Sequence, residues 1–428
     1  MKSPHTQFSG DEPSPPLPRG GDSLSPQAAL PDGWRWVVLD EVCTRGTGTR
    51  DPRRELEVPF RYVDISSVDN QSKLITQARA LPGKEAPSRA RQVIRTNDVL
   101  VATTRPNLNA VALVPPDLDN EICSTGFCVL RPKPEIEPDY LFAFVQTTAF
   151  VRTLSDLVKG ALYPAVTDGQ VRAQKLPLPP LSEQRRIAAL LHDQLVAVAE
   201  ARAAVQAQIN AAQALPAAHL RSVFSNSVAS DWPRQPLAEV CELLPSKSVA
   251  LAGDTEVRAI TSACLTETGF DPAGVKTARM WKADAQESVV QPGEILIARS
   301  NTPDLVGRVS IYTGGPRGVV ASDLTIRLWP GAEIRSEFLV GYLSFLYTSG
   351  YWRERAGGAS GTMKKITRSQ IEAERIPVPS ASIQETVAGR LKTELATALV
   401  IERLLEERLA ALTPLPAALL REAFAGRL

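Results

Sequence analysis

The sequence predicts a mixed α/β (α+β) protein in which two duplicated domains are each followed by a long helix. Three observations predict this fold class: the chain repeats itself at an offset near 200 residues, each copy opens with short β-type runs, and each copy closes with a long heptad pattern. A repeat of this length indicates two duplicated domains and not a solenoid of short units. We expect the two long helices to pack as an antiparallel coiled coil with pseudo-two-fold symmetry.

The internal repeat is clearest around the two long helices. The segment LPLPPLSEQ from Leu176 matches IPVPSASIQ from Ile376, and LPAAHLRSVF from 215 matches LPAALLREAF from 415, all at an offset of 200. Upstream the offset falls to 198 and then to 196, which locates small insertions between the matching blocks, as loops allow. The repeat predicts five segments: a disordered Pro- and Ser-rich tail (1–31), a first α/β domain (32–178), a first helix and connector (179–229), a second α/β domain (230–378), and a second helix with a C-terminal segment (379–428).

Short apolar runs predict the strands of each domain. They are VLVAT (99–103) and AVALV (110–114) in the first copy, and EILIA (294–298), RVSIY (308–312) and LTIRLW (324–329) in the second. Gly, Pro, Asn and Asp separate these runs, as is typical of turns between strands. Helix-like segments follow at 140–154 and 337–352, so each domain is expected to mix strands and helices.

The two long helices are predicted over about 182–213 and 382–413, each after a Pro-containing boundary. Their apolar residues follow a heptad seam, which needs a partner helix, and the other copy is the obvious partner. The seam is interrupted at equivalent places by Arg202 and Glu402. We hypothesise that these two side chains face each other and set the register; the alternative is that both point into solvent.

Composition and charge exclude several classes. The chain has 43% hydrophobic and 22% charged residues, a net charge of +1, and no run of about 18 apolar residues that would span a bilayer. The first residues lack the apolar region of a secretory signal, and five sparse cysteines without C-x-x-C favour neither a disulfide framework nor a zinc site. A cytoplasmic location and no metal are expected.

Catalytic motifs are missing from the sequence. Gly83-Lys84 lacks the rest of a P-loop, no Lys has an acid two positions before it, and no N/D/S-P-P-aromatic tetrapeptide occurs. The three histidines are too few and too scattered to suggest hydrolytic chemistry. We therefore expect no catalytic residue and no cofactor bound to this chain, while an enzyme of unfamiliar type stays a weaker alternative.

Basic residues are unevenly distributed although the net charge is nearly zero. Residues 79–95 and 349–370 each carry a net charge of +4, and a milder basic cluster spans 45–54. Arg and Lys can neutralise phosphates, and the glycines and hydroxyls of 357–362 allow close backbone approach to a phosphate. The alternative for each window is an ordinary solvated face.

The order of parts resembles the specificity (S) subunit of type I restriction–modification systems. The motifs that carry the resemblance are Leu176–Gln184 and its copy Ile376–Gln384, the element GEILIARS from Gly293 with DVLVATTRP from Asp98, and the Gly-containing segment before Lys364. The second proline motif departs from the family at 380, 381 and 383. The resemblance covers about residues 32–428 and leaves the tail outside.

This resemblance implies a targeting subunit that is not itself an enzyme. In that family each α/β domain reads one half of a split, asymmetric sequence in double-stranded DNA, and the paired helices act as a spacer. Two modification subunits would bring S-adenosylmethionine and adenine-N6 methylation, and restriction subunits would bring ATP- and Mg-dependent translocation and cleavage. The expected DNA-binding residues are Arg45, Arg79, Lys84, Arg89, Arg105, Asn107, Asn109, Arg299, Asn301, Arg355, Lys364 and Lys365.

The predicted helix length can be compared with the geometry of DNA. About 32 residues at 1.5 Å per residue give roughly 48 Å, and one turn of B-DNA is about 34–36 Å long. We therefore expect half-site centres about one turn apart. Two alternatives stay open: a non-enzymatic helical scaffold for protein partners with no role at DNA, and the recognition subunit of a related system with a different nuclease partner.

Overall fold

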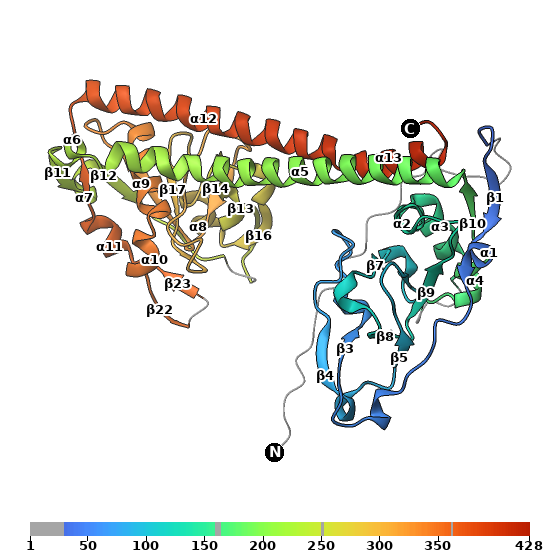
Figure 1. The fold of residues 1–428 in the computed structure, drawn as a ribbon. Helices are drawn as coiled ribbons and strands as arrows, with labels where there is room; N and C mark the ends of the chain where they lie inside the picture. Colours follow the sequence, from blue (N-terminus) through green and yellow to red (C-terminus); the bar gives the residue numbers. More distant parts are fainter. Residues whose placement is uncertain (1–29, 159–163, 250–251, 361–362) are drawn as a thin grey trace, which may run out of the picture. The chain divides into compact units, whose positions relative to one another are not determined.

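The computed structural model describes residues 30–158, 164–249, 252–360 and 363–428. The chain forms two compact units (Figure 1). Unit 1 contains the residues up to 203 together with 410–428, and unit 2 contains residues 204–409. Each unit therefore combines one α/β domain with parts of both long helical segments. The predicted disordered tail lies outside the described residues up to residue 29.

Unit 1 contains two four-stranded sheets and one strand pair. Central strand β6 is buried at every residue, so it reads as a continuous apolar run, as strands covered on both faces do. The sheets have the orders β2-β9-β6-β7, which is antiparallel, and β4-β3-β8-β5, in which β3 and β8 are parallel. Their bounds are β1 Arg35–Val38, β2 Cys43–Thr44, β3 Pro59–Val63, β4 Arg79–Pro82, β5 Ala90–Val93, β6 Val99–Ala102, β7 Val111–Leu113, β8 Ile122–Ser124, β9 Phe127–Pro132 and β10 Lys175–Leu178.

Unit 2 repeats this topology. The sheet β12-β21-β17-β19 matches β2-β9-β6-β7, and β16-β13-β20 matches β4-β3-β8, including the parallel pair. Strand β11 pairs with β24 just as β1 pairs with β10. Unit 2 adds the hairpin β14-β15 and a three-stranded sheet β18-β23-β22. The bounds are β11 Arg234–Pro236, β12 Cys241–Leu244, β13 Thr255–Ile260, β14 Leu265–Thr266, β15 Gly269–Phe270, β16 Lys276–Met280, β17 Ile295–Ala298, β18 Ser300–Asn301, β19 Val309–Ile311, β20 Val319–Ala321, β21 Thr325–Pro330, β22 Gly357–Ser360, β23 Met363–Lys365 and β24 Arg375–Pro377.

Short helices complete each domain, and the two predicted over 140–154 and 337–352 are both interrupted. The first is split into α2 and α3 because Thr147 leaves the helical conformation and caps α3 through its hydroxyl. The second ends at Thr348, and Gly350 takes a left-handed conformation with a φ of 79°. The bounds are α1 Leu39–Val42, α2 Pro138–Phe144, α3 Thr148–Asp156, α4 Asp168–Arg172, α6 Ser227–Ser230, α7 Leu237–Val240, α8 Lys282–Glu287, α9 Ser336–Thr348, α10 Tyr351–Arg355 and α11 Arg368–Ala373.

The long helices are α5 (Leu181–Phe224), α12 (Ala381–Leu412) and α13 (Leu415–Phe424). Helix α12 has the expected length, but α5 runs on to 44 residues with Pro216 inside it. The second copy carries a further proline, Pro414, where the first has Ala214, and the helix is interrupted at 413–414. One missing N–H is tolerated in α5, whereas two prolines two residues apart break the second helix.

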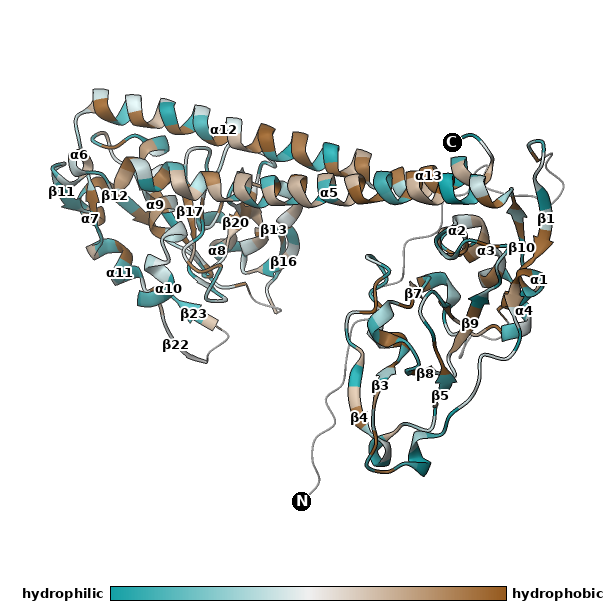
Figure 2. Ribbon diagram, in the orientation of Figure 1, coloured by the Kyte–Doolittle hydropathy of each residue, from teal (hydrophilic) through white to brown (hydrophobic). Residues whose placement is uncertain are grey.

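In both helices the apolar residues of the heptad pattern are at least half-buried, as the pattern predicts. Figure 2 shows hydrophobic and hydrophilic residues alternating along α5 and α12. Within unit 2 the two helices are antiparallel. The amide of Gln213 donates to Glu402 over 2.9 Å, and Nδ1 of His219 lies 3.1 Å from the carboxylate of Glu394. These two polar contacts give the register of the pair in unit 2.

This register corrects the expected pairing of Arg202 with Glu402. Glu402 accepts its hydrogen bond from Gln213, which lies about three helical turns beyond Arg202 in α5. In an antiparallel helix pair, a residue faces its equivalent in the other repeat only where the pseudo-two-fold axis crosses the pair. The contacts within unit 2 put that meeting point near residues 207 and 407, about five residues beyond 202 and 402. Arg202 itself is exposed, so the solvent alternative describes it better.

The last turn of each repeat's helical segment completes an aromatic core. In unit 2 the ring of Phe224 lies 5.7 Å from Phe338 and 5.4 Å from Tyr342. In unit 1 the ring of Phe424, at the end of α13, lies 4.9 Å from Tyr140 and 5.5 Å from Phe144. Each domain is thus closed by the helical segment that follows the other domain in sequence.

Phe424→Ala is expected to lower the free energy of unfolding of unit 1 by about 3–5 kcal/mol, because it removes a fully buried ring and leaves a cavity. Unit 2 should be unaffected. Hydrogen exchange of amides in β6 and β9, compared with β17 and β21, measures the two units separately. Leu415→Ala, on an exposed side chain of the same helix, is the control. Equal loss of protection in both units would contradict the assignment.

Candidate nucleic-acid interface

In unit 2 the expected DNA-binding residues come together around one small sheet. Strand β18 pairs with β23 so that Ser300 faces Lys365 and Asn301 faces Lys364. The backbone N–H of Ile366 donates to the carbonyl of Arg299 over 2.9 Å, which extends the same pairing. Residues more than 60 positions apart in sequence therefore share one edge, which combines two ammonium groups, a guanidinium and an amide.

Arg299 and Arg355 are less free than the lysines of this edge. Arg299 is half-buried and donates to the carbonyl of Asp323 over 3.2 Å, while its Nε is buried without an acceptor. Arg355 ends α10, just before β22, and its guanidinium lies 3.7 Å from the centre of the Tyr351 ring. That stacking holds the charge at the base of the β22–β23 hairpin. Lys365 and Arg355 are exposed, whereas Lys364 is half-buried.

In unit 1 the corresponding residues form a single tight turn. The 3₁₀ turn η4 (Pro106–Leu108) is flanked by Arg105 and Asn109, both in the left-handed region with φ of 50° and 47°. Arg105, Asn107 and Leu108 are exposed, whereas Asn109 is half-buried. A charged and an amide side chain thus stand side by side on a constrained backbone, which suits contacts to base edges.

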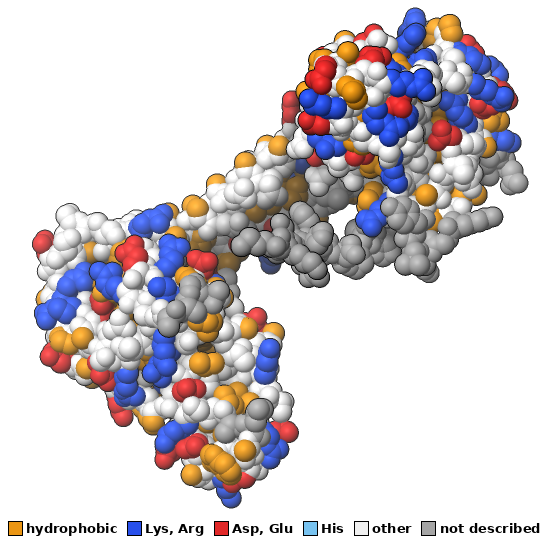
Figure 3. Space-filling view, turned by 90° about the horizontal axis from the view of Figure 1, so that it is seen from below, with side chains coloured by type: hydrophobic (Ala, Val, Ile, Leu, Met, Phe, Trp, Pro, Cys, Tyr) orange, Lys and Arg blue, Asp and Glu red, His pale blue; other side chains and the backbone are white. Residues whose placement is uncertain are grey.

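The other expected residues of unit 1 lie on different elements. Arg45 is ion-paired with Asp40 beside α1, Lys84 lies 3.4 Å from Glu57, and Arg79 lies above the Tyr62 ring. Among the described residues no acidic side chain pairs with Arg89 or Arg105. Figure 3 shows Lys and Arg side chains scattered with Asp and Glu over one face of each unit. The structure therefore gathers Arg105, Asn107 and Asn109 but leaves Arg45, Arg79, Lys84 and Arg89 apart from them.

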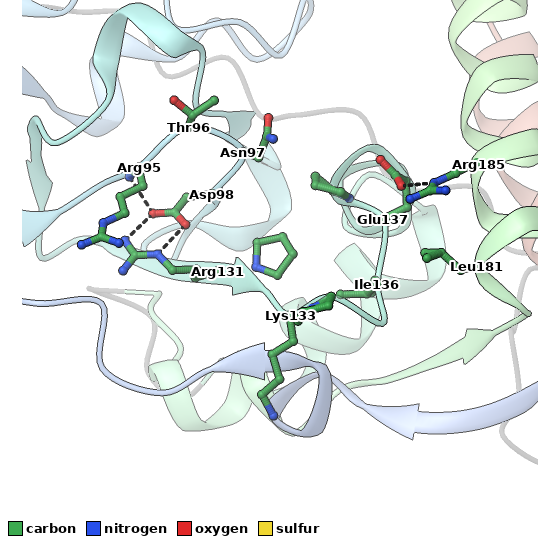
Figure 4. A pocket seen from close by; sticks show the side chains of 13 residues that line it. Arg95, Thr96, Asn97, Asp98, Arg131, Lys133, Ile136, Glu137, Leu181 and Arg185 are labelled. Carbon is green, nitrogen blue, oxygen red and sulfur yellow. Dashed lines mark hydrogen bonds and ion pairs between the residues drawn. The ribbon is translucent and has the colours of Figure 1, made fainter.

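A buried ion pair supports the main sheet in both units. Asp98, at the start of β6, accepts two hydrogen bonds of 2.8 and 2.9 Å from Arg131 (Figure 4). In unit 2, Glu294 accepts two of 2.8 Å from Arg327. Arg327 also donates to the carbonyls of residues 245, 287 and 289, so it pins the loop after β12 and the end of α8. Bidentate geometry and these extra acceptors satisfy the buried charges.

A buried glutamine joins each domain to its long helix. The amide of Gln184 donates to the carbonyls of Glu135 and Pro179 and accepts from the N–H of Glu137. Gln384 makes the same three bonds with residues 333, 379 and 335. Each glutamine is 1% exposed. The Gln that ends the Pro-containing motif therefore fixes the domain on the first turn of the helix, because all its polar atoms are satisfied there.

Next to each glutamine an ion pair joins the domain to the helix, and its charges are reversed between the two units. Glu137 of the first domain contacts Arg185 of α5 over 3.0 Å, and Figure 4 shows this pair at the edge of a surface pocket. In unit 2, Arg335 of the domain lies 3.7 Å from Glu385 of α12. Both pairs are exposed and contribute little stability. They do make the outer surfaces of the two helix starts electrostatically different.

Sequence reasoning missed these supports, although the repeat contains their signal. A carboxylate followed 33 positions later by an arginine occurs in both copies, as Asp98 with Arg131 and Glu294 with Arg327. The pair Gln184 and Gln384 also matches at the offset of 200. Charged or amide residues that recur inside predicted buried elements indicate a structural network. Within the described residues there is no group of three or more potential metal ligands, and no helix is both long and apolar enough to cross a membrane.

The fold and the site define a duplicated protein whose two domains have one topology and different loop side chains. The family model described as "Type I restriction modification DNA specificity domain" matches residues 31–210. The HsdS subunit from Thermoanaerobacter tengcongensis is 32% identical, covering 94% of this chain and 99% of that one, with a TM-score of 0.69. A chain from work on complex assembly and conformational transition of the type I R-M system is also 32% identical, covering 94% and 100%, with a TM-score of 0.77.

A curated relative spans nearly the whole chain as well. The type I restriction enzyme StySPI specificity subunit of Salmonella potsdam is 24% identical over 425 residues, which is 93% of this chain and 90% of the relative. The chain therefore belongs to the family of type I restriction–modification DNA specificity subunits. Members of this family are DNA-targeting subunits, and the resemblance inferred from the motifs is confirmed.

Arg327→Met is expected to lower the free energy of unfolding of unit 2 by about 3–5 kcal/mol, because it leaves the Glu294 carboxylate buried without its partner. The equivalent Arg131→Met in unit 1 should cost less, since Arg131 is 18% exposed against 3% for Arg327. Chemical denaturation monitored by hydrogen exchange measures both.

The double variant Glu294→Leu/Arg327→Met separates the two explanations of such a loss. It should recover most of the stability, because no unpaired charge is left in the core. A double variant as unstable as Arg327→Met would show instead that the hydrogen bonds to residues 245, 287 and 289 carry the effect.

Proposed function

We propose that this chain reads a split, asymmetric sequence in double-stranded DNA, with one half-site for each α/β domain, and positions modification and restriction subunits on it. The observation that carries the proposal is the contrast between equal topology and unequal loops. After β6 the first domain presents Arg105, Asn107 and Leu108 on a tight turn, and after β17 the second presents a strand paired with Lys364 and Lys365. Two domains that share one topology but present different side chains can bind two different half-sites.

The chemistry of such a complex belongs to its other subunits. The sequence has no P-loop and no methyltransferase tetrapeptide, which supports a non-enzymatic targeting role for this chain. S-adenosylmethionine for adenine-N6 methylation would be held by two modification subunits, and ATP with Mg by restriction subunits. The exposed basic and amide side chains of this chain supply phosphate and base contacts. The complex would work in the cytoplasm, where the DNA is.

The long helices supply the spacer in this proposal. Helix α12 has 32 residues, so it is about 48 Å long, and α5 with 44 residues is about 66 Å long. Either length exceeds one turn of B-DNA, which is about 34–36 Å. Half-site centres about one turn apart, with unread bases between them, fit such a spacer. Neither alternative, a scaffold without a role at DNA or a related system with another nuclease, is favoured by the comparisons.

Co-expression with a modification subunit, followed by mapping of methylated adenines, tests the function. A split motif with two specific parts and unspecified bases between them is expected. Arg105→Ala/Asn107→Ala should relax the first part only, by about 1–3 kcal/mol per lost base contact, and Asn301→Ala/Lys364→Ala the second part only. No methylation, or a continuous motif, would contradict the proposal.

Lengthening the spacer tests the role of the helices. Inserting seven residues into both α5 and α12 keeps the heptad seam and adds about 10 Å to each, or about three base pairs of B-DNA. The number of unspecified bases in the methylated motif should grow while both half-sites keep their sequences. Unchanged spacing, or altered half-site bases, would show that the helices do not act as a ruler.

A further inference from the structure

The turn that presents Arg105 and Asn107 has a left-handed backbone at both of its ends. Five described residues other than glycine have a positive φ, and all lie in unit 1. Two of them, Arg105 and Asn109, flank the turn η4, and a third, Lys73, reaches the turn from the loop between β3 and β4. Strained backbone persists only where the surroundings hold it, and such residues cluster at functional sites.

Two contacts from outside clamp the turn at its ends. At the first, the N–H of Arg105 donates to the carbonyl of Pro164 over 2.8 Å. At the second, Nζ of Lys73 donates to the carbonyl of Asn109 over 2.7 Å. Lys73 lies at the end of a tight turn. Its N–H donates to the Asp69 carbonyl, and the Asp69 carboxylate accepts from the N–H groups of Gln71 and Ser72.

We propose that Lys73 is a positioning residue for DNA reading by the first domain: its ammonium holds the Arg105–Asn109 turn in the presented conformation, so recognition of the first half-site depends on it and recognition of the second does not. The inference rests on the proposed function, because it assumes that this turn contacts DNA. Lys73 is half-buried and binds a backbone carbonyl, so it acts through the turn and is not itself proposed to contact a base.

The second domain supports its equivalent segment by other means. There β18 is fixed by pairing with β23, and the following loop is held at Asp304 by the hydroxyl of Tyr347 over 2.9 Å and by Arg353 at 3.3 Å. In the described part of unit 2, every residue with a positive φ is a glycine. A change at Lys73 should therefore affect one half-site, which gives the proposal an internal control.

The charge of Lys73 fixes the direction of any pH dependence. Burial lowers the pKa of the Lys73 ammonium to about 8, and Asp69 in the same turn acts in the opposite direction. A lysine released into solvent would keep a pKa of about 10.4, so by linkage the conformation with Lys73 in its buried site is favoured as pH rises from 7 to 9. Recognition of the first half-site should therefore not weaken over this range.

The effect of the same proton on folding has the same sign. A lysine whose folded pKa lies below its unfolded pKa destabilises the fold at low pH, and this penalty disappears as pH rises through about 8 to 10. Lys73 therefore makes unit 1 more stable at pH 9 than at pH 7.

The experiment uses the complex of this chain with its modification subunit and the split motif from methylation mapping. Binding is measured at pH 7, 8 and 9 to DNA with both half-sites, with only the first intact, and with only the second intact. For the wild type, affinity gained from the first half-site should hold or rise, by up to about tenfold, from pH 7 to 9, and that from the second should not change.

Three variants separate positioning from general effects. Lys73→Met should lose about tenfold in affinity at the first half-site at pH 7, and its affinity should be independent of pH up to pH 9. Lys73→Arg keeps a charged donor, so it should bind as the wild type does at pH 7 and stay flat to pH 9. Lys175→Met, an exposed lysine of the same unit, is the matched control and should change nothing.

The outcomes distinguish this inference from the function it rests on. If no split motif is found, the proposed function fails before Lys73 is tested. If a split motif is found but Lys73→Met affects both half-sites equally, or neither, then Lys73 does not position the turn. A wild-type affinity for the first half-site that falls between pH 7 and 9 would overturn the role of Lys73 in the same way.

Discussion

The interaction on which both units depend is the aromatic contact at the end of each repeat's helical segment. Phe224 follows the first domain in sequence yet packs into the core of the second, against Phe338 and Tyr342. Phe424 follows the second domain and closes the core of the first. In neither repeat does the helix end pack on its own domain, so each compact unit combines parts of both repeats. This explains why the motif around residues 215–224 recurs at the very end of the chain.

Elements that repeat faithfully carry the scaffold, and the elements that differ are those to which we assign recognition in the proposed function. The buried glutamine at the domain–helix joint and the buried carboxylate–arginine pair under the main sheet have the same partners in both units. Groups of this kind cannot change singly without leaving a buried polar atom unpaired. The exposed turn after β6 and the strand after β17 have no such constraint. Their side chains can therefore differ between the repeats without cost to the fold.

Much of this architecture could be predicted from the sequence because repetition and periodicity are local signals. The offset of 200 revealed the duplication, and continuous apolar runs such as residues 99–102 marked buried central strands. The pairing of Arg202 with Glu402 could not be predicted correctly, since the register depends on where the pseudo-two-fold axis crosses the helices. The contact made by Lys73 could not be predicted from the sequence. Its partner is a backbone carbonyl 36 residues away, and every residue has such a carbonyl. Basic windows in the sequence also do not show which cations have partners: Arg79 lies above the Tyr62 ring, and Lys84 lies 3.4 Å from Glu57.

The two domains hold the segment that follows the central strand by different interactions. In unit 2 the segment after the central strand is held by strand pairing, which distributes the constraint over several backbone hydrogen bonds. In unit 1 it is a strained turn held at two points, of which one is a titratable ammonium. Paired backbone tolerates the loss of one contact, whereas a strained turn relaxes when one clamp is removed. If the turn reads DNA as proposed, recognition by the first domain is therefore the more sensitive of the two to changes in this support.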